Sequence, residues 1–234
     1  MSKVSRRKFV YSAAFAIGGF VLGFASRGLV PTTIPPPEPT PTTPSDALNQ
    51  LMQGNQRFVQ NALIHPNLSA ERRAEVAQGQ SPWAVILGCI DSRVPPEVVF
   101  DQGLGDMFVA RTAGQVIDNA VMGSIEFAVE EGAKLIMVLG HKNCGAVKAT
   151  IETIQNNGHP EGEIAALVDA IEPAYATAES LPGDIVENTV RANVKLEVQT
   201  LEGSDIISHA LDQGSAEIVG ARYDLDTGAV TIIT

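Results

Sequence analysis

Apolar runs alternate with amphipathic segments along most of the chain beyond residue 45. Two runs, Trp83–Gly88 and Leu135–Gly140, are apolar at every position and have the length of a strand. A strand of this kind is buried on both of its faces, as in a parallel sheet covered by helices. Three further segments predict strands at Phe108–Arg111, Glu217–Ala221 and Ala229–Ile233.

Amphipathic segments between these runs predict the helices. Ser45 and Asp46 stand before the first of them, where their side chains can cap free backbone N–H groups. The helices are expected at Ala47–Gln60, Ser69–Gln78, Val116–Glu131, Gly145–Asn156, Glu163–Glu179 and Asp184–Leu201. Together the elements indicate an α/β fold. We expect a mostly parallel central sheet of about four to five strands, flanked by helices, with an N-terminal helical arm.

Residues 1–25 differ from the rest of the chain. They carry four basic residues and no acidic one, followed by the apolar stretch Phe9–Ala25. Gly23 and Ala25 are small where a signal peptidase requires it, so this segment is expected to be an export signal cleaved after Ala25. The segment Ser5–Phe9 (SRRKF) resembles a twin-arginine motif, which predicts a periplasmic or other extracytoplasmic location. The alternative is an uncleaved N-terminal membrane anchor.

Residues 26–44 are expected to be a linker. The part from Pro31 to Pro44 consists mostly of proline and threonine. Proline removes backbone donors and holds the chain extended, so this segment does not suit a helix or a sheet. A single globular domain is then expected over residues 45–234.

The chain beyond the leader is acidic. It holds 12 Lys and Arg residues against 27 Asp and Glu residues. An acidic surface repels phosphate backbones, so nucleic acid is not expected as a partner.

The two cysteines follow the two fully apolar runs. Cys89 comes directly after the first run, and His141 and Cys144 follow the second as H-x-x-C. The carboxyl ends of parallel strands meet at one edge of a sheet, so these side chains are expected to lie together. Two thiolates and one imidazole suit tetrahedral Zn²⁺ with an open fourth position. A disulfide, or two free thiols beside a core histidine, are the alternatives.

Asp91 and Arg93 follow Cys89 closely. Two residues apart in an extended segment, they point to the same side and can pair through a carboxylate and a guanidinium. Left unpaired, Asp91 could take the fourth position on the zinc. An ordinary ion pair at a turn is the alternative.

The pattern C-x-D-x-R after one strand and H-x-x-C-G after a later one resembles the beta-class carbonic anhydrases. The similarity extends roughly from Ala47 to Ile233. The resemblance implies one Zn²⁺ per subunit, reversible hydration of carbon dioxide by attack of a zinc-bound hydroxide, and a homodimer or larger homo-oligomer. It also implies that Asp91 and Arg93 form the catalytic dyad.

The same resemblance implies a substrate pocket. Gln80 matches a glutamine that binds substrate in the plant-like branch, Phe108 matches an aromatic wall, and Gly145 matches a residue whose backbone approaches the substrate. Phe127 stands where a pocket tyrosine is common. Ile86 replaces a tryptophan of the bicarbonate-regulated branch, so a plant-like, open site is expected. A carbonyl sulfide or carbon disulfide hydrolase, and a non-catalytic zinc-binding protein, are the alternatives.

Overall fold

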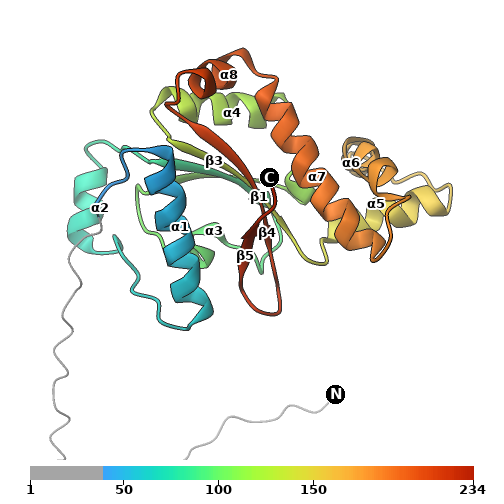
Figure 1. The fold of residues 1–234 in the computed structure, drawn as a ribbon, viewed down its shortest axis with the longest axis horizontal. Helices are drawn as coiled ribbons and strands as arrows, with labels where there is room; N and C mark the ends of the chain where they lie inside the picture. Colours follow the sequence, from blue (N-terminus) through green and yellow to red (C-terminus); the bar gives the residue numbers. More distant parts are fainter. Residues whose placement is uncertain (1–38) are drawn as a thin grey trace, which may run out of the picture. The chain divides into compact units, whose positions relative to one another are not determined.

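A five-stranded sheet forms the centre of the protein in the computed structural model, which describes residues 39–234 (Figure 1). The strand order is β2-β1-β3-β4-β5. The first four strands in this order are parallel, and β5 pairs with β4 in the antiparallel direction. The strands are β1 (Ala84–Cys89), β2 (Met107–Thr112), β3 (Leu135–His141), β4 (Glu217–Tyr223) and β5 (Val230–Ile232). The predicted mostly parallel sheet is therefore confirmed.

Strand β1 lies between β2 and β3, so Leu87 is in register with Ala110 on one side and Val138 on the other. All residues of β1 and β3 are buried, as their continuous apolar runs predict. All residues of β2 are only half-buried, because this strand forms an edge of the sheet.

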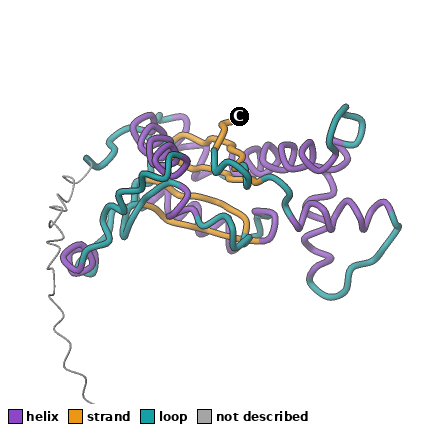
Figure 2. The backbone as a smooth tube through the Cα atoms, turned by 90° about the horizontal axis from the view of Figure 1, so that it is seen from below, coloured by secondary structure: helices purple, strands orange, loops and turns teal. Residues whose placement is uncertain are grey.

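Helices cover both faces of the sheet, and a helical extension that holds α5 and α6 projects beyond it (Figures 1 and 2). The described helices are α1 (Pro44–Val59), α2 (Ala70–Val76), α3 (Pro96–Val99), α4 (Asn119–Glu130), α5 (Gly145–Gln155), α6 (Ile164–Ala178), α7 (Ile185–Glu202) and α8 (Asp205–Asp212), with a 3-10 turn η1 (Ala113–Gln115). The expected N-terminal helix is thus present as α1.

Three clusters of buried side chains make the core. On one face of the sheet, Leu51 of α1 and Phe100 after α3 pack with Ile86 and Met137. On the other face, residues of α4, α7 and α8 pack with the alternate residues of β1 and β3. A third cluster, formed with α5, α6 and α7, contains both cysteines. The carboxyl ends of β1 and β3 therefore meet an apolar, buried environment.

Helix boundaries differ from the expectation at two starts. The cap of α1 is Thr43, whose hydroxyl accepts a hydrogen bond from the Asp46 amide, and not Ser45 or Asp46. Pro44 fits the first turn. Backbone N–H groups have no partner within the helix there, so proline, which lacks this group, loses no hydrogen bond. Helix α4 begins at Asn119 rather than Val116, since Asp118 caps it and the preceding residues form the turn η1.

Two short helices, α3 and α8, were not among those expected. Helix α3 has only four residues, too few for a period to show in the sequence. Helix α8 does carry a start signal, because the Ser204 side chain accepts a hydrogen bond from the Ile207 amide.

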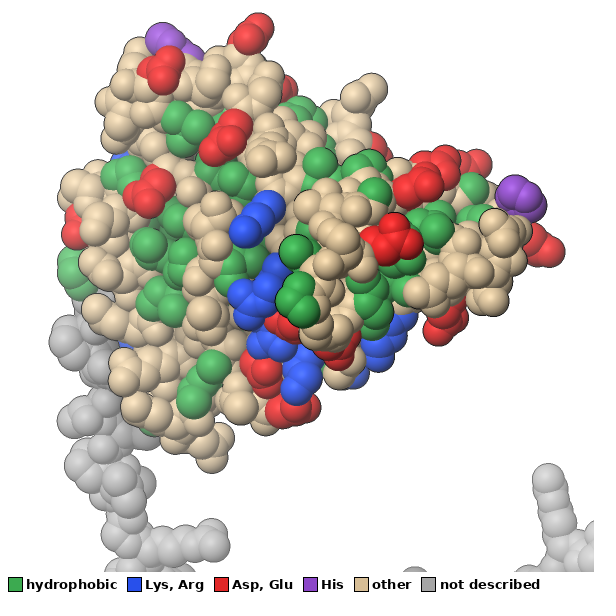
Figure 3. All heavy atoms as spheres, turned by 45° about the vertical axis from the view of Figure 1, so that its right-hand side comes forward, with side chains coloured by type: hydrophobic (Ala, Val, Ile, Leu, Met, Phe, Trp, Pro, Cys, Tyr) green, Lys and Arg blue, Asp and Glu red, His purple; other side chains and the backbone are tan. Residues whose placement is uncertain are grey.

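The predicted leader of residues 1–25, and the linker up to residue 38, lie outside the described residues. Among residues 39–234, no helix combines the length and apolar character that crossing a membrane requires. On the face drawn in Figure 3, basic side chains gather in a band bordered by acidic ones. Ion pairs are common in this part of the chain, including Arg222 with Asp224 and Arg191 with Glu187.

Candidate metal centre and active site

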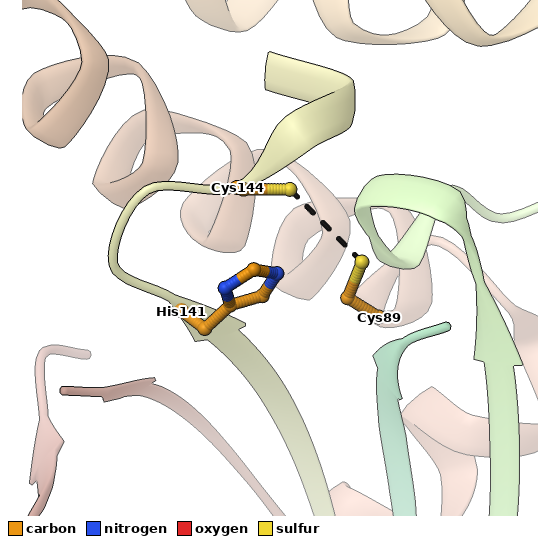
Figure 4. A group of neighbouring side chains, drawn as sticks. All are labelled: Cys89, His141 and Cys144. Carbon is orange, nitrogen blue, oxygen red and sulfur yellow. Dashed lines mark hydrogen bonds between the residues drawn. The ribbon is translucent and has the colours of Figure 1, made fainter. Parts of the chain in front are cut away.

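Three predicted metal ligands meet at the carboxyl edge of the sheet (Figure 4). Cys89 is the last residue of β1, His141 is the last residue of β3, and Cys144 directly precedes α5. One ligand atom from each of the three lies within 4.8 Å of the other two, and all three residues are buried. The prediction that the two strand ends bring these side chains together is confirmed.

The two cysteines are free thiols whose sulfur atoms lie 4.0 Å apart. They do not form the disulfide that was one alternative. The hydrogen bond from Cys144 lowers the pKa of Cys89, with smaller contributions from His141 and from the Gly114 amide. The same hydrogen bond, together with burial, raises the pKa of Cys144. The backbone amides of Ala146 and Val147 at the start of α5 lower the pKa of Cys144, but the effects of Cys89 and of burial are larger.

The ring of His141 is held by the main chain. Its Nδ1 lies 3.0 Å from the carbonyl oxygen of Lys142, so this nitrogen donates its proton to an acceptor. The other nitrogen, Nε2, is buried and has no hydrogen-bond partner within the described residues. A satisfied core histidine, the second alternative, would leave no such atom. A bare imidazole nitrogen facing two thiols is a donor set that fits Zn²⁺.

Asp91 and Arg93 form a bidentate pair beside these ligands. The Arg93 side chain donates to both carboxylate oxygens, over 2.9 and 2.7 Å, and the Arg93 amide donates to Oδ1 over 3.0 Å. The guanidinium holds the pKa of Asp91 well below its usual range. Oδ2 of Asp91 lies 3.9 Å from Nε2 of His141. The carboxylate therefore stays charged and faces the site.

Two contacts at the site had no counterpart in the sequence-based prediction. Arg111 on β2 donates to the carbonyl oxygens of Cys89 and Asp91, over 2.8 and 2.6 Å, and so fixes the backbone that carries both. The Gly114 amide donates to Sγ of Cys89 over 3.3 Å. An arginine in a strand that is otherwise mostly apolar was the available signal for the first contact. The second depends on loop geometry and left no signal.

The predicted pocket residues fall into two groups. Gly145 directly follows Cys144, and a side chain added at Gly145 would meet no atom of the described chain within 4 Å. Gln80 instead precedes β1, whose length of about 16 Å separates its two ends. Phe108 on β2 is in register with Val85 on β1. Val85 lies four residues before Cys89, so Phe108 is about 13 Å from Cys89 along the strand direction. One chain therefore does not bring Gln80 and Phe108 to its own metal ligands.

Phe108 and Phe127 lie against each other instead, with ring centroids 6.4 Å apart. They line a cavity of about 420 Å³ at the edge strand β2 and helix α4. Phe127 is 58% exposed, which is unusual for a side chain of this size. The aromatic pair forms an open apolar surface beside the edge of β2, which pairs with no further strand within residues 39–234.

Comparison with known proteins bears on this arrangement. The family model described as "Carbonic anhydrase" matches residues 84–230. This segment contains the three candidate metal ligands, the Asp91–Arg93 pair and the aromatic pair. The chain belongs to the beta-class carbonic anhydrase family.

Members of this family from bacteria are similar over most of the chain. "Carbonic anhydrase 2" of Mycobacterium tuberculosis is 44% identical over 193 residues, which cover 82% of this chain and 93% of that protein. A carbonic anhydrase of Mycolicibacterium smegmatis is also 44% identical, over 82% of this chain and 94% of its own. The chain is accordingly a carbonic anhydrase.

Solved beta-carbonic anhydrases share the fold. The beta-carbonic anhydrase CcaA matches with a TM-score of 0.62 at 25% identity, over 80% of this chain and 95% of that one. The Coccomyxa enzyme, solved in complex with acetazolamide, matches with a TM-score of 0.63 at 26% identity, over 80% and 86% of the two chains. Beta-carbonic anhydrases are zinc enzymes, and the Cys-His-Cys cluster of this chain has the donor atoms for that metal.

Proposed function

We propose that this protein is a zinc enzyme that reversibly converts carbon dioxide and water into bicarbonate and a proton. Cys89, His141 and Cys144 would hold the metal. The observation that carries the proposal is the buried Nε2 of His141, which has no hydrogen-bond partner among residues 39–234 and faces two thiols. Burying such an atom is unfavourable unless a ligand satisfies it.

When bound, zinc acidifies a water so that hydroxide is available near neutral pH. The residues of the chain then orient the reaction. Asp91 accepts a hydrogen bond from the attacking oxygen and directs its lone pair at the carbon of the substrate. Arg93 holds Asp91 by two charge-assisted hydrogen bonds, so the carboxylate keeps its orientation.

The same pair supports an open, plant-like site. Both oxygens of Asp91 are engaged by Arg93, so the carboxylate has little freedom to become a fourth metal ligand. Ile86, at the position of the regulatory tryptophan, is fully buried in the core below the site. We infer that the fourth position stays available to water and that bicarbonate does not close the site.

We infer that the complete pocket needs two copies of the chain. Gln80, Phe108 and Phe127 lie away from their own ligands, as described above. Gln80 lies in the segment before β1, and Phe108 and Phe127 lie at the half-buried edge strand β2. In the described part of the chain this edge pairs with no further strand, so it offers backbone groups and an apolar surface to a partner. A second copy placed against this edge would bring its Phe108 and Phe127 towards the Asp91 of the first copy. The first copy would do the same for the second. The active unit is then a homodimer or a multiple of it.

The substrate is the part of the proposal that needs a direct comparison. Carbonyl sulfide and carbon disulfide are also linear, apolar and electrophilic. Turnover of carbon dioxide and of both sulfur compounds should be measured on one zinc-loaded preparation. We expect carbon dioxide to give the highest kcat/KM. A higher value for a sulfur compound would reassign the substrate, and no turnover of any of the three would favour a non-catalytic zinc-binding protein.

We also propose that the chain is exported. The support is the basic and apolar composition of residues 1–25 with its SRRKF segment. Expression of the full chain, followed by fractionation, should place the protein outside the cytoplasm. Replacing Arg6 and Arg7 by Lys should retain it inside if the twin-arginine route is used.

A further inference from the structure

The loop between β2 and α4 places a hydrogen-bond donor on a metal ligand. It turns through two consecutive left-handed residues, Gly114 with φ 69° and Gln115 with φ 49°. This conformation costs of order 1–2 kcal/mol for a residue with a side chain, so Gln115 does not adopt it freely. The result of the turn is that the Gly114 amide points at Sγ of Cys89, 3.3 Å away.

Position 114 strongly favours glycine. A Cβ there would lie 2.8 Å from Cδ1 of Ile171 and 3.2 Å from Cβ of Ala146, in addition to the left-handed φ. Helices α5 and α6 therefore press directly on this residue. The close approach leaves the Gly114 backbone little room to move, and its direction determines where the amide points.

The carbonyl of Gly114 is held from a third helix. Asn193 of α7 is completely buried, and its Nδ2 donates to Gly114 O over 2.9 Å. Asn193 lies 79 residues further along the chain. Gly114 is thus fixed at both polar atoms, with its N–H on the sulfur and its C=O on Asn193.

Packing alone does not account for an asparagine at this position. Oδ1 of Asn193 is buried without a hydrogen-bond partner in the described part of the chain. Burying an amide oxygen in this way is costly, and leucine has nearly the same shape without that cost. The contact that remains to explain the residue is the one to Gly114.

We propose that Asn193 is a positioning residue for the metal centre, which keeps the Gly114 amide directed at the Cys89 sulfur. The proposal rests on the metal site of the proposed function. A hydrogen bond to a ligand sulfur draws electron density from it and fixes its direction. Two thiolates place much negative charge on the centre, so a donor at one of them strengthens the metal as a Lewis acid. Asn193 touches neither substrate nor metal and acts only through Gly114.

The test uses the full chain and the variant Asn193→Leu, which removes the donor and keeps the volume. Zinc affinity is measured by competition with a chelator. The absorption of the cobalt-substituted protein is measured in the near ultraviolet, where sulfur-to-metal charge transfer is seen. We expect zinc affinity to fall about 10- to 100-fold. We expect the charge-transfer band to move to longer wavelength, because the sulfur regains electron density.

Thr189→Val is the matched control. Thr189 is also completely buried on α7, but its hydroxyl donates to the Ile185 carbonyl of its own helix and not to Gly114. This variant should leave the zinc affinity within about twofold of the parent and the band unmoved. Asn193→Ala, which lacks any risk of overpacking, serves if the leucine variant does not fold.

The proposal is overturned if both Asn193 variants retain the parent's affinity and band, or if Thr189→Val shows the same changes as Asn193→Leu. Failure of the proposed function gives a different result. In that case the parent protein itself binds neither zinc nor cobalt at this centre, or binds zinc and turns over no carbon dioxide.

Discussion

Nδ1 of His141 lies 3.0 Å from the carbonyl oxygen of Lys142, the next residue in the chain. A carbonyl only accepts, so the proton of the neutral ring is on Nδ1 and the lone pair is on Nε2. The backbone itself therefore selects the tautomer that a metal ligand requires. Lys142 is fixed in turn, since its amide donates to Tyr223 O and its side chain pairs with Asp226.

Asp91 should be required as a carboxylate. Asp91→Asn keeps the shape but replaces one accepting oxygen by a donor that repels Arg93. We expect kcat to fall by about 10²–10⁴-fold, the usual range for loss of a proton acceptor. Zinc content should not change, because Asp91 is not among the three clustered ligands. Stopped-flow hydration and metal analysis measure both.

The control for this variant is Asp169→Asn, which makes the same chemical change at an exposed position of α6. It should retain full activity. If Asp91→Asn also retains the full hydration rate, the dyad has no role in the reaction.

Glu197 should make folding stability depend on pH. It is buried on α7, and burial raises its pKa to about 8 from the ordinary 4.5. The folded protein favours the neutral form of Glu197. The free energy of unfolding is therefore highest below pH 4.5 as far as this group is concerned, and it falls as the pH rises through 8. Glu197→Gln mimics the neutral form. It should equal the parent near pH 4.5 and be more stable at pH 9, by at most about 5 kcal/mol.

Denaturant unfolding at the two pH values tests this prediction. Glu202→Gln, an exposed position on the same helix, is the control and should have little effect at either pH. If Glu197→Gln has the same stability as the parent at pH 9, or lower, burial of the acidic group is not the dominant effect at this position.

Phe127 should be needed for assembly. It is exposed beside Phe108 at the edge of the sheet, where we place the second copy. Phe127→Asp puts a charge into that apolar surface, so we expect a monomer by light scattering and at least tenfold lower activity, with zinc still bound. Leu181→Asp is the control, because Leu181 is 50% exposed and lies beside α6 and α7, outside the cavity that Phe108 and Phe127 line.

The Leu181→Asp control should keep the parent's molecular mass in solution and its activity. A Phe127→Asp protein that keeps the parent's mass would place the interface elsewhere. A monomer with full activity would show that one chain suffices for the pocket.

The cluster of candidate metal ligands could be predicted from sequence because its residues follow two long apolar runs. Continuous burial identifies β1 and β3 as parallel strands, and their carboxyl ends must then share an edge. Local rules were enough for Cys89, His141 and Cys144. The Asp91–Arg93 pair could also be predicted locally, because its two residues are only two positions apart in the sequence.

The rest of the site depends on contacts that no local pattern encodes. Asn193 meets Gly114 from 79 residues away, and side chains of α5 and α6 lie close to Gly114 at the turn. The separation of Phe108 from the ligands follows from strand register, which is known only once the sheet is assembled. The aromatic residues could be named from the sequence, but only the assembled sheet shows that they lie away from their own chain's candidate ligands.

The most direct test of the account measures zinc content and carbon dioxide hydration together in the full-chain protein, His141→Ala and His209→Ala. His209 is an exposed histidine on α8 and serves as the matched control. We predict one zinc per chain and rapid hydration in the parent and in His209→Ala. We predict more than about 100-fold weaker zinc binding and no hydration above background in His141→Ala. A His141→Ala protein that binds zinc and hydrates carbon dioxide like the parent would contradict the assigned metal centre.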